Sequence, residues 1–384
     1  MAETASPIEE YEPGRRTSLQ TEELRELGLQ LLEATGRLVG IPSVSFHEKE
    51  IADELYSQLS HHGHLELERV GDNLVASTRL GRRQRVILAG HLDTVPGGGA
   101  VSVENGRVTG LGAADMKGGL AVLAWLAGAV TEPAIDLSFV FYVAEEVAQE
   151  HNGLGDLHRR RPELLQADAA ILAEPTGGVL ELGCQGSLQL QVTLHGQRAH
   201  AARSWMGENA IHRLAPLLEV LGRYLPREPV LDGCVFKESL QAVGLEAGVA
   251  ANVVPDSATL RVNHRYAPDR SPSEALASVE ALLRPVMRDD DELVVLDLAQ
   301  AAPPSLSHPV LAALARVVEA PPRAKLGWTD VARFSMIGVP AVNFGPGRPE
   351  LAHVPGEWVE AEELGRTAAA LRRFVLEGDR ALGR

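Results

Sequence analysis

A change in the pattern of the predicted strands at Ser187 places the strongest constraint on the fold of this chain. Before that residue the strands are continuous apolar runs, "RQRVILAG", "IDLSFVFYV" and "ADAAILAEP", which are typical of strands buried on both faces of a sheet. After it, "SLQLQVTLHG" alternates strictly, with polar residues on one face and four apolar residues on the other, Leu188, Leu190, Val192 and Leu194. The chain therefore contains two sheets in two different environments.

The first type of strand alternates with helical segments, which predicts a layered α/β region. The segment "MKGGLAVLAWLAGAV" is an apolar helix between two of the buried strands. Buried strands and helices return after residue 300, in "HPVLAALARVVEA", "GVPAVNFGPG" and "EAEELGRTAAALRRFVLE". We therefore predict a discontinuous α/β domain, residues 19–187 and 300–384, with a smaller domain inserted in it.

The inserted segment, residues 188–299, has the predicted order strand, helix, strand, strand, helix, strand. A capping box that starts at Ser271 opens the second helix. The first helix, in "NAIHRLAPLLEVL", places four apolar residues on one side, Ile211, Leu214, Leu218 and Leu221. This order predicts a small open-faced α+β sandwich.

Composition excludes several classes of protein. The chain of 384 residues carries a net charge of −16, which argues against general nucleic-acid binding. It has no apolar run of membrane length and only two cysteines, Cys184 and Cys234, too few for a disulfide scaffold or a cysteine-based zinc site. Residues 1–18 are polar and acidic, without a secretory signal pattern, so we expect a flexible tail and a cytoplasmic protein.

Five short segments place a histidine or a carboxylate after an apolar strand or inside a glycine-rich loop. They are "LAGHLDTVP" (His91, Asp93), "GLGAADMKGG" (Asp115), "YVAEEVA" (Glu145, Glu146), "ILAEPTGG" (Glu174) and "GRPELAHVPGE" (His353). Each alone is more simply explained as a surface residue or a turn residue. As a set they are expected to converge, because sites in open α/β sheets gather at strand ends, and converging acids need a cation.

Two histidines and three carboxylates suit zinc, and they suffice for two ions if one carboxylate bridges. A water held between two such ions loses a proton near neutral pH. One glutamate of the Glu145–Glu146 pair can then ligate a metal while its neighbour acts as general acid and base.

These segments, in this order, resemble the M20 metallopeptidases, and within them the actinobacterial desuccinylases. "GQRAHAARSWMGENAIHR", "GVAANVVPD", "NHRYAPDRS" and "GWTDVARF" extend the resemblance over nearly the whole chain after the tail. It implies a zinc-aminopeptidase-like catalytic domain with an inserted ferredoxin-like α+β domain that acts as lid and dimerisation surface.

The resemblance also implies roles for the five segments. Two Zn²⁺ ions, for which Co²⁺ can substitute, would be held by His91 and Glu174, by Glu146 and His353, and by Asp115 as the bridge. Glu145 would be the general acid and base, and Asp93 would orient the His91 imidazole. A cis peptide bond is expected between Asp115 and Met116.

In the inserted domain, the resemblance implies that His200 reaches the active site of the partner in a homodimer and stabilises the oxyanion. It implies substrate contacts from five further residues: Asn252, Arg265, Gly327, Trp328 and Thr329. The chain departs from the family at Gln185, where an arginine is usual, and in the uncharged run "AHVPGEWV". Both departures lie near the expected substrate site.

The implied reaction is hydrolysis of the succinyl amide of N-succinyl-LL-2,6-diaminopimelate by a dinuclear-zinc hydroxide, a step of lysine biosynthesis. The alternatives are a related deacylase of the N-acetylornithine deacetylase or aminoacylase type, a carboxypeptidase, or a metal-free binding protein on the same fold. A zinc-stabilised structural module is disfavoured, because it would need four closed ligands and no spare base.

Overall fold

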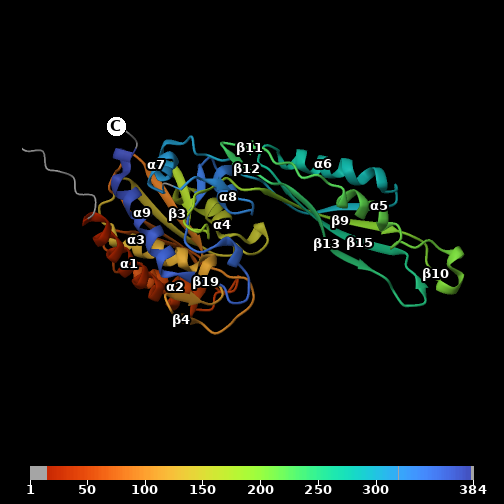
Figure 1. The fold of residues 1–384 in the computed structure, drawn as a ribbon, viewed down its shortest axis with the longest axis horizontal. Helices are drawn as coiled ribbons and strands as arrows, with labels where there is room; N and C mark the ends of the chain where they lie inside the picture. The colour runs from red at the N-terminus through yellow and green to blue at the C-terminus, as the bar shows by residue number, and fades with distance from the viewer. Residues whose placement is uncertain (1–14, 319, 382–384) are drawn as a thin grey trace, which may run out of the picture.

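The chain forms two regions of different construction, an α/β region and an elongated extension joined to one end of it (Figure 1). The computed structural model describes residues 15–318 and 320–381. The extension comprises residues 186–299, and the α/β region comprises the described residues on either side. Residues 1–14 of the predicted tail lie outside the described residues, whereas residues 15–18 belong to the first helix, which begins at Arg15.

An eight-stranded sheet forms the centre of the α/β region, in the order β1-β2-β6-β3-β7-β18-β8-β17. Its central strands β6, β3, β7 and β18 run parallel to their neighbours in this group. The strands are β1 (Glu66–Val70), β2 (Asn73–Ser77), β3 (Arg85–His91), β6 (Asp136–Tyr142), β7 (Ala169–Leu172), β8 (Glu181–Leu182), β17 (Arg323–Ala324) and β18 (Ala341–Asn343). A three-stranded sheet, β19-β5-β4, lies beside them, formed by β4 (Ser102–Glu104), β5 (Arg107–Thr109) and β19 (Trp358–Glu360).

Helices cover both faces of the large sheet. Along β3, Val86 and Leu88 belong to one apolar cluster, while Ile87 and Ala89 belong to another on the opposite face. The first cluster includes residues of α1 (Arg15–Val39), α2 (Lys49–Ser60), α3 (Gly118–Ala129), α7 (Pro309–Val318) and α9 (Ala361–Ala381), and the second includes residues of α4 (Gly153–Arg160) and α8 (Val331–Met336). The predicted layered α/β fold is therefore confirmed.

The extension is built on a four-stranded antiparallel sheet in the order β13-β15-β9-β16. Its main elements are β9 (Gly186–His195), α5 (Leu214–Gly222), β13 (Ser239–Ala247), β15 (Ser257–Tyr266), α6 (Pro272–Leu283) and β16 (Glu292–Ala299). Four two-residue strands also lie in this range: β10 (Ala199–His200), β11 (Val230–Leu231), β12 (Cys234–Val235) and β14 (Val253–Val254). This is the strand order of a ferredoxin-like fold, as expected. The alternating residues of β9 lie as predicted, with all four leucine and valine side chains buried beneath the helices.

One helix of the extension differs from the prediction. The pattern placed Ile211 and Leu218 on the same side as Leu214 and Leu221, but Ile211 and Leu218 are about two-fifths exposed, whereas the other two are buried. The helix begins only at Leu214, and its buried face contains Leu214, Leu217 and Leu221. The residues before Leu214 form turns, so the helical spacing counted from Ile211 does not apply.

A two-stranded ribbon connects the two regions. Cys184 and Ala302 exchange backbone hydrogen bonds of 3.0 Å in both directions, and Ser187 pairs with Ala299 where β9 begins and β16 ends. Between them, a Cβ atom on Gly186 would lie 2.0 Å from the Tyr266 ring, so only glycine allows this close packing. The entry to the extension and the exit from it therefore lie side by side.

A membrane-spanning helix is not found in the part of the chain that the structure describes, where no helix is both long and apolar enough to cross a bilayer.

Candidate metal centre

The predicted histidines and carboxylates come together at one edge of the large sheet. His91 is the last residue of β3, Glu145 and Glu146 follow β6, and Glu174 follows β7. Because β3 runs parallel to both β6 and β7, the carboxyl ends of these strands lie at the same edge. Asp115 lies in the turn just before α3, and His353 lies in the loop before β19.

Asp115 lies at the centre of this cluster. Its Oδ1 atom is 3.1 Å from His91 Nε2, and its Oδ2 atom is 3.5 Å from His353 Nε2. His353 Nε2 is also 2.7 Å from Glu146 Oε1. The ligand atoms of His91, Asp115 and Glu174 lie within 4.8 Å of one another, as do those of Asp115, Glu146 and His353. The cluster therefore offers two three-residue metal sites that share Asp115. The expected cis peptide bond between Asp115 and Met116 is present.

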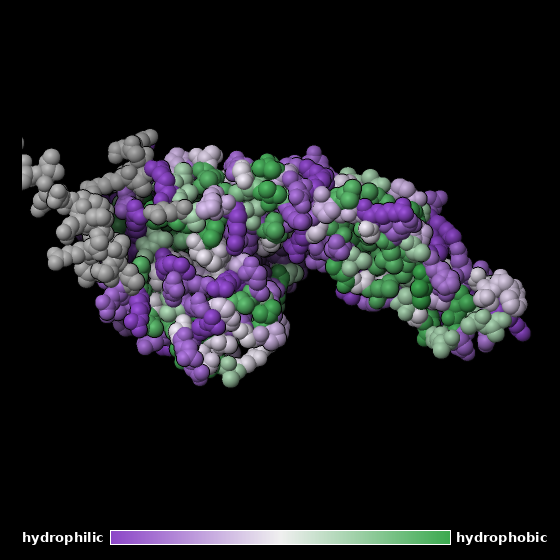
Figure 2. Space-filling view, in the orientation of Figure 1, coloured by the Kyte–Doolittle hydropathy of each residue, from purple (hydrophilic) through white to green (hydrophobic). Residues whose placement is uncertain are grey.

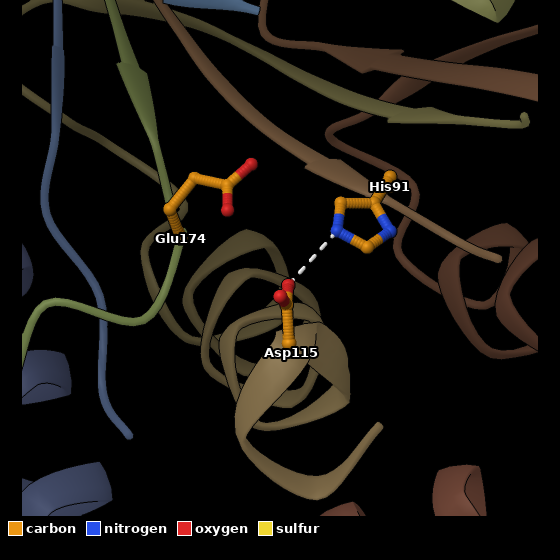
Figure 3. Close-up of side chains that lie close together, drawn as sticks. All are labelled: His91, Asp115 and Glu174. Carbon is orange, nitrogen blue, oxygen red and sulfur yellow. Dashed lines mark hydrogen bonds and ion pairs between the residues drawn. The ribbon is translucent and has the colours of Figure 1, made fainter. Parts of the chain in front are cut away.

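The Glu174 carboxylate is directed toward the cluster from the opposite side to His91 (Figure 3). It is buried, and its Oε1 atom has no hydrogen-bond partner among the described residues. Burial, with the charge of Asp115 adding to it, raises the pKa of Glu174 to about 7. Such a buried, unpartnered oxygen fits a cation site, because a buried carboxylate is stable only when it is paired, protonated or bound to a metal.

Glu145 stands apart from the two groups that contain Asp115. Its carboxylate lies near His91 and Glu146. Burial raises the pKa of Glu145 well above its usual value, and the nearby charges of Glu174 and Asp330 raise it further. A carboxyl group that favours its protonated form beside a possible metal site is suited to proton transfer.

Asp93 supports the cluster in two ways. His91 Nδ1 lies 3.0 Å from the Asp93 backbone oxygen and 3.5 Å from its carboxylate. The same carboxylate accepts hydrogen bonds from the backbone amides of Glu145 and Glu146, both at 3.0 Å. These amides point at Asp93 because Ala144 takes a left-handed conformation, with φ of 56°. Asp93 thus holds the imidazole and both glutamates in place together.

Glu357 was not identified from the sequence. Its buried carboxylate accepts hydrogen bonds from the backbone amides of Gly112, Ala114 and Asp115, at 3.0, 2.7 and 2.8 Å. It therefore fixes the turn that presents the Asp115 side chain. The only signal in the sequence was a glutamate four residues after His353 in a loop rich in glycine and proline.

Asp330 was also missed, and it joins two loops of the site. Its buried Oδ2 atom accepts a hydrogen bond of 2.8 Å from Asn152 Nδ2, and Arg333 Nε lies 2.7 Å from Oδ1. Asn152 caps α4, directly after the loop of Glu145, and Arg333 donates to the backbone oxygen of Gln149 in that loop. The loop with the two glutamates is thereby tied to the segment that contains Trp328 and Thr329.

A cavity of about 550 Å³ opens over the cluster. The predicted substrate residues Gly327, Trp328 and Thr329 line it, together with Glu145 and His353. The Trp328 indole donates to the backbone oxygen of Gln300, which fixes its ring, and Thr329 Oγ1 donates to Asn343 Oδ1. The structure therefore places these three residues beside the possible metal sites.

The remaining predicted residues are outside this cavity. His200 and Asn252 are exposed, and β10 (Ala199–His200) lies at the far tip of the extension (Figure 1). Arg265 lies at the base of the extension, where it pairs with Ser187, and it makes no ion pair with any described residue. Gln185 is buried, and its side-chain amide donates to the backbone oxygen of Lys237.

Comparison with known proteins gives a consistent result. Residues 87–377 match peptidase family M20/M25/M40. The chain is 45% identical over 347 residues to a putative succinyl-diaminopimelate desuccinylase of Mycobacterium tuberculosis, covering 90% of this chain and 97% of that protein. It is 45% identical over 352 residues to a succinyl-diaminopimelate desuccinylase of Corynebacterium glutamicum, covering 89% of this chain and 95% of that protein. In fold it is similar to a dinuclear metal-binding M20 peptidase of Bacillus subtilis, with a TM-score of 0.69 and 15% identity over 92% of this chain and 98% of that one.

Proposed function

The chain belongs to peptidase family M20/M25/M40, and from this premise we propose that it hydrolyses N-succinyl-LL-2,6-diaminopimelate to succinate and LL-2,6-diaminopimelate. The observation that carries the proposal is the 45% identity, over 89% of the chain, to the Corynebacterium glutamicum protein named succinyl-diaminopimelate desuccinylase. The reaction is a metal-dependent amide hydrolysis and would serve lysine biosynthesis.

We propose that two Zn²⁺ ions occupy the cluster. His91 and Glu174 would hold one ion, Glu146 and His353 would hold the other, and Asp115 would be shared between them. The donor set fits, because imidazole and carboxylate groups are the usual zinc ligands and the buried Glu174 oxygen lacks any other partner. Bound zinc ions would lower the pKa of a water held between them and stabilise negative charge on the amide oxygen.

Side chains of the protein would then carry out the proton transfers. We propose that Glu145 takes a proton from the attacking water and delivers it to the leaving nitrogen of the amide. Its raised pKa suits the second half of this task, since the protonated carboxyl must act as an acid. Asp93 and Glu357 would be positioning residues, because they hold the backbone on which Glu145 and Asp115 are presented.

We propose that the protein acts as a homodimer formed through the extension. Apolar residues gather on the face of the extension that Figure 2 shows, and Val243, Leu245 and Leu296 on its two edge strands are exposed. Paired edge strands and a covered apolar face are usual in stable dimers. We also propose a cytoplasmic location, which the unpaired state of Cys184 and Cys234 supports.

His200 would connect dimerisation with catalysis. Its Nδ1 atom accepts a hydrogen bond from the backbone amide of Ala202 at 3.0 Å, so its Nε2 atom carries the hydrogen and is free to donate. At the tip of the extension this donor is remote from the cluster of its own chain (Figure 1). We propose that it reaches the partner's site and binds the developing oxyanion, while Arg265 binds a substrate carboxylate.

Steady-state hydrolysis of N-succinyl-LL-2,6-diaminopimelate, measured beside N-acetylornithine and acetylated amino acids with and without added zinc, tests the proposal. We expect a strong zinc-dependent preference for the succinylated substrate. Zinc-dependent cleavage of another substrate would retain the metal site and assign a related deacylase activity. An absence of cleavage with zinc bound would refute the enzymatic proposal.

A further inference from the structure

The cavity over the cluster has two positively charged residues in its wall. Arg323 and Lys325 line it, on and just after β17, together with Glu181 on β8. The two strands are parallel neighbours, and Arg323 pairs directly with Glu181. Apart from His353, the other charged residues of the lining are acids, so these two cations distinguish one part of the cavity from the rest.

One carboxylate serves both cations. Arg323 Nε donates to Glu181 Oε1 at 2.8 Å, and Lys325 Nζ lies 3.0 Å from Glu181 Oε2. Since one negative charge balances only one of them, the trio keeps a surplus positive charge. Arg323 is half-exposed and could pair with Glu181 alone. The second cation therefore requires an explanation other than neutralising Glu181.

Lys325 is unusually buried for a lysine, because only 7% of its surface is exposed. Burial lowers its pKa, but the charges of Glu181, Glu174 and Asp115 more than reverse this and raise it, so the ammonium stays charged. Its three N–H donors meet one partner, Glu181, among the residues that the structure describes. It forms no ion pair with the proposed metal ligands among the described residues.

We infer that Lys325, with Arg323 beside it, forms a subsite for a substrate carboxylate that is remote from the scissile amide. This inference rests on the proposed function, whose substrate carries a carboxylate at the end of the acyl group and another at the far end of the amino acid. Both have the same chemistry and would accept charge-assisted hydrogen bonds from an ammonium and a guanidinium. The subsite lies in the α/β region, which also contains the proposed metal ligands.

The test is the Lys325→Met variant, assayed with three substrates. They are N-succinyl-LL-2,6-diaminopimelate, its N-acetyl analogue, which lacks the acyl carboxylate, and N-succinyl-L-lysine, which lacks the distal carboxylate. With the first substrate we expect KM to rise roughly 10- to 100-fold, as for loss of a hydrogen bond between charged groups, with little change in kcat. Lys325→Arg should retain most of the affinity, and Lys49→Met on exposed α2 is the matched control.

The three substrates identify which carboxylate is bound. If Lys325 binds the acyl carboxylate, the penalty of Lys325→Met disappears with the N-acetyl analogue; if it binds the distal one, the penalty disappears with N-succinyl-L-lysine. An equal penalty with all three substrates would overturn the inference while leaving the proposed function intact. Failure of the wild-type protein to cleave any succinylated substrate would instead remove the proposed function, and the inference with it.

A second variant separates carboxylate binding by Lys325 from neutralisation of Glu181. Lys325→Met leaves Glu181 with Arg323 as its partner, whereas Glu181→Gln/Lys325→Met removes both charges of the Lys325 pair. We expect the double variant to keep the raised KM. Recovery of the wild-type KM in the double variant would mean that Lys325 acts only by neutralising Glu181, which would contradict the inference.

Discussion

The two sheets of this protein differ in how completely their own chain covers them. All seven residues of β6, in the large sheet, are buried, whereas Leu240 is the one buried residue among the nine of β13 in the extension. Helices lie on both faces of the large sheet, but α5 and α6 cover one face of the smaller one. The large sheet is thus covered on both faces, whereas the smaller sheet has one uncovered face and two unpaired edge strands among the described residues.

The largest expected effect comes from replacing the proposed general acid and base, which lies in the α/β region. We expect Glu145→Gln to lower kcat by about 10²- to 10⁴-fold, because the general acid and base is lost while the ligand set is untouched. Zinc content, measured by atomic absorption, should match the wild type. Glu146→Gln is the comparison, since it should lose metal as well as activity. Near-normal turnover by Glu145→Gln would disprove the assigned role.

The second test removes a group from the extension. His200→Ala should fold, dimerise and bind zinc, yet lose about 10²- to 10³-fold in kcat as an oxyanion donor is lost. If His200 acts on the partner's site, mixing the His200→Ala and Glu145→Gln proteins under exchange should restore about a quarter of wild-type activity, since half of the dimers then hold one intact site. Mixed dimers that stay inactive would place His200 in the site of its own chain.

A matched pair of substitutions compares a covered and an uncovered position of the smaller sheet. Leu190 is 1% exposed beneath the helices, and Leu245 is 54% exposed on an edge strand. We expect Leu190→Ala to lower the free energy of unfolding by about 2 to 5 kcal/mol. Leu245→Ala should change it by less than about 0.5 kcal/mol at protein concentrations where the dimer is dissociated.

Urea denaturation at several protein concentrations makes this comparison. A dimer formed through the edge strand β13 predicts that the effect of Leu245→Ala grows with concentration. An effect of Leu245→Ala that is independent of concentration would mean that this edge has no partner.

The smallest expected effect concerns an ion pair in the extension. Burial raises the pKa of Asp291, but hydrogen bonds from Arg213 and from the backbone amides of Arg288 and His195 outweigh it, so the pKa lies below its usual value. An acid with a lowered pKa stabilises the fold above its unfolded pKa of about 4, and this contribution disappears as pH falls through the folded value.

Asp291→Asn should therefore be less stable than the wild type at neutral pH, with a difference that narrows as the pH is lowered from about 5 to 2. Thermal denaturation across this range measures it, and Asp290→Asn, at the exposed neighbouring residue, is the control. A difference between wild type and Asp291→Asn that does not change with pH would contradict the role assigned to the ionised carboxylate.

The sequence predicted those features of the site that have a local pattern. His91 and Glu174 follow continuous apolar strands, and strand ends meet at one edge of a parallel sheet, so their convergence could be anticipated. Glu357 and Asp330 had no such signal, because an acid in a loop looks the same whether it is solvated or buried against backbone amides. Their roles depend on contacts between residues far apart in the chain.

Periodicity was reliable for strands and less so for one helix. Alternation identified the buried face of β9 correctly, since every residue of a strand shares one period. Ile211 was misplaced because the apolar pattern continues through turns that precede the first helical residue, Leu214. The local signal was Pro216, because proline is tolerated in the first turn of a helix but disrupts a helix interior, which favours a start near Leu214.

The ribbon that joins the two regions bears on how the extension can vary among related chains. Because Cys184 is bridged to Ala302 and Ser187 to Ala299, the extension leaves and re-enters the α/β region at a single point. The extension is not wholly separate beyond this point, because Cys234, Phe236 and Ala267 belong to the same apolar cluster as helices of the α/β region. The four-stranded sheet and its tip can therefore diversify while the candidate metal centre keeps its framework, whereas the residues around Cys234 must continue to fit the α/β core.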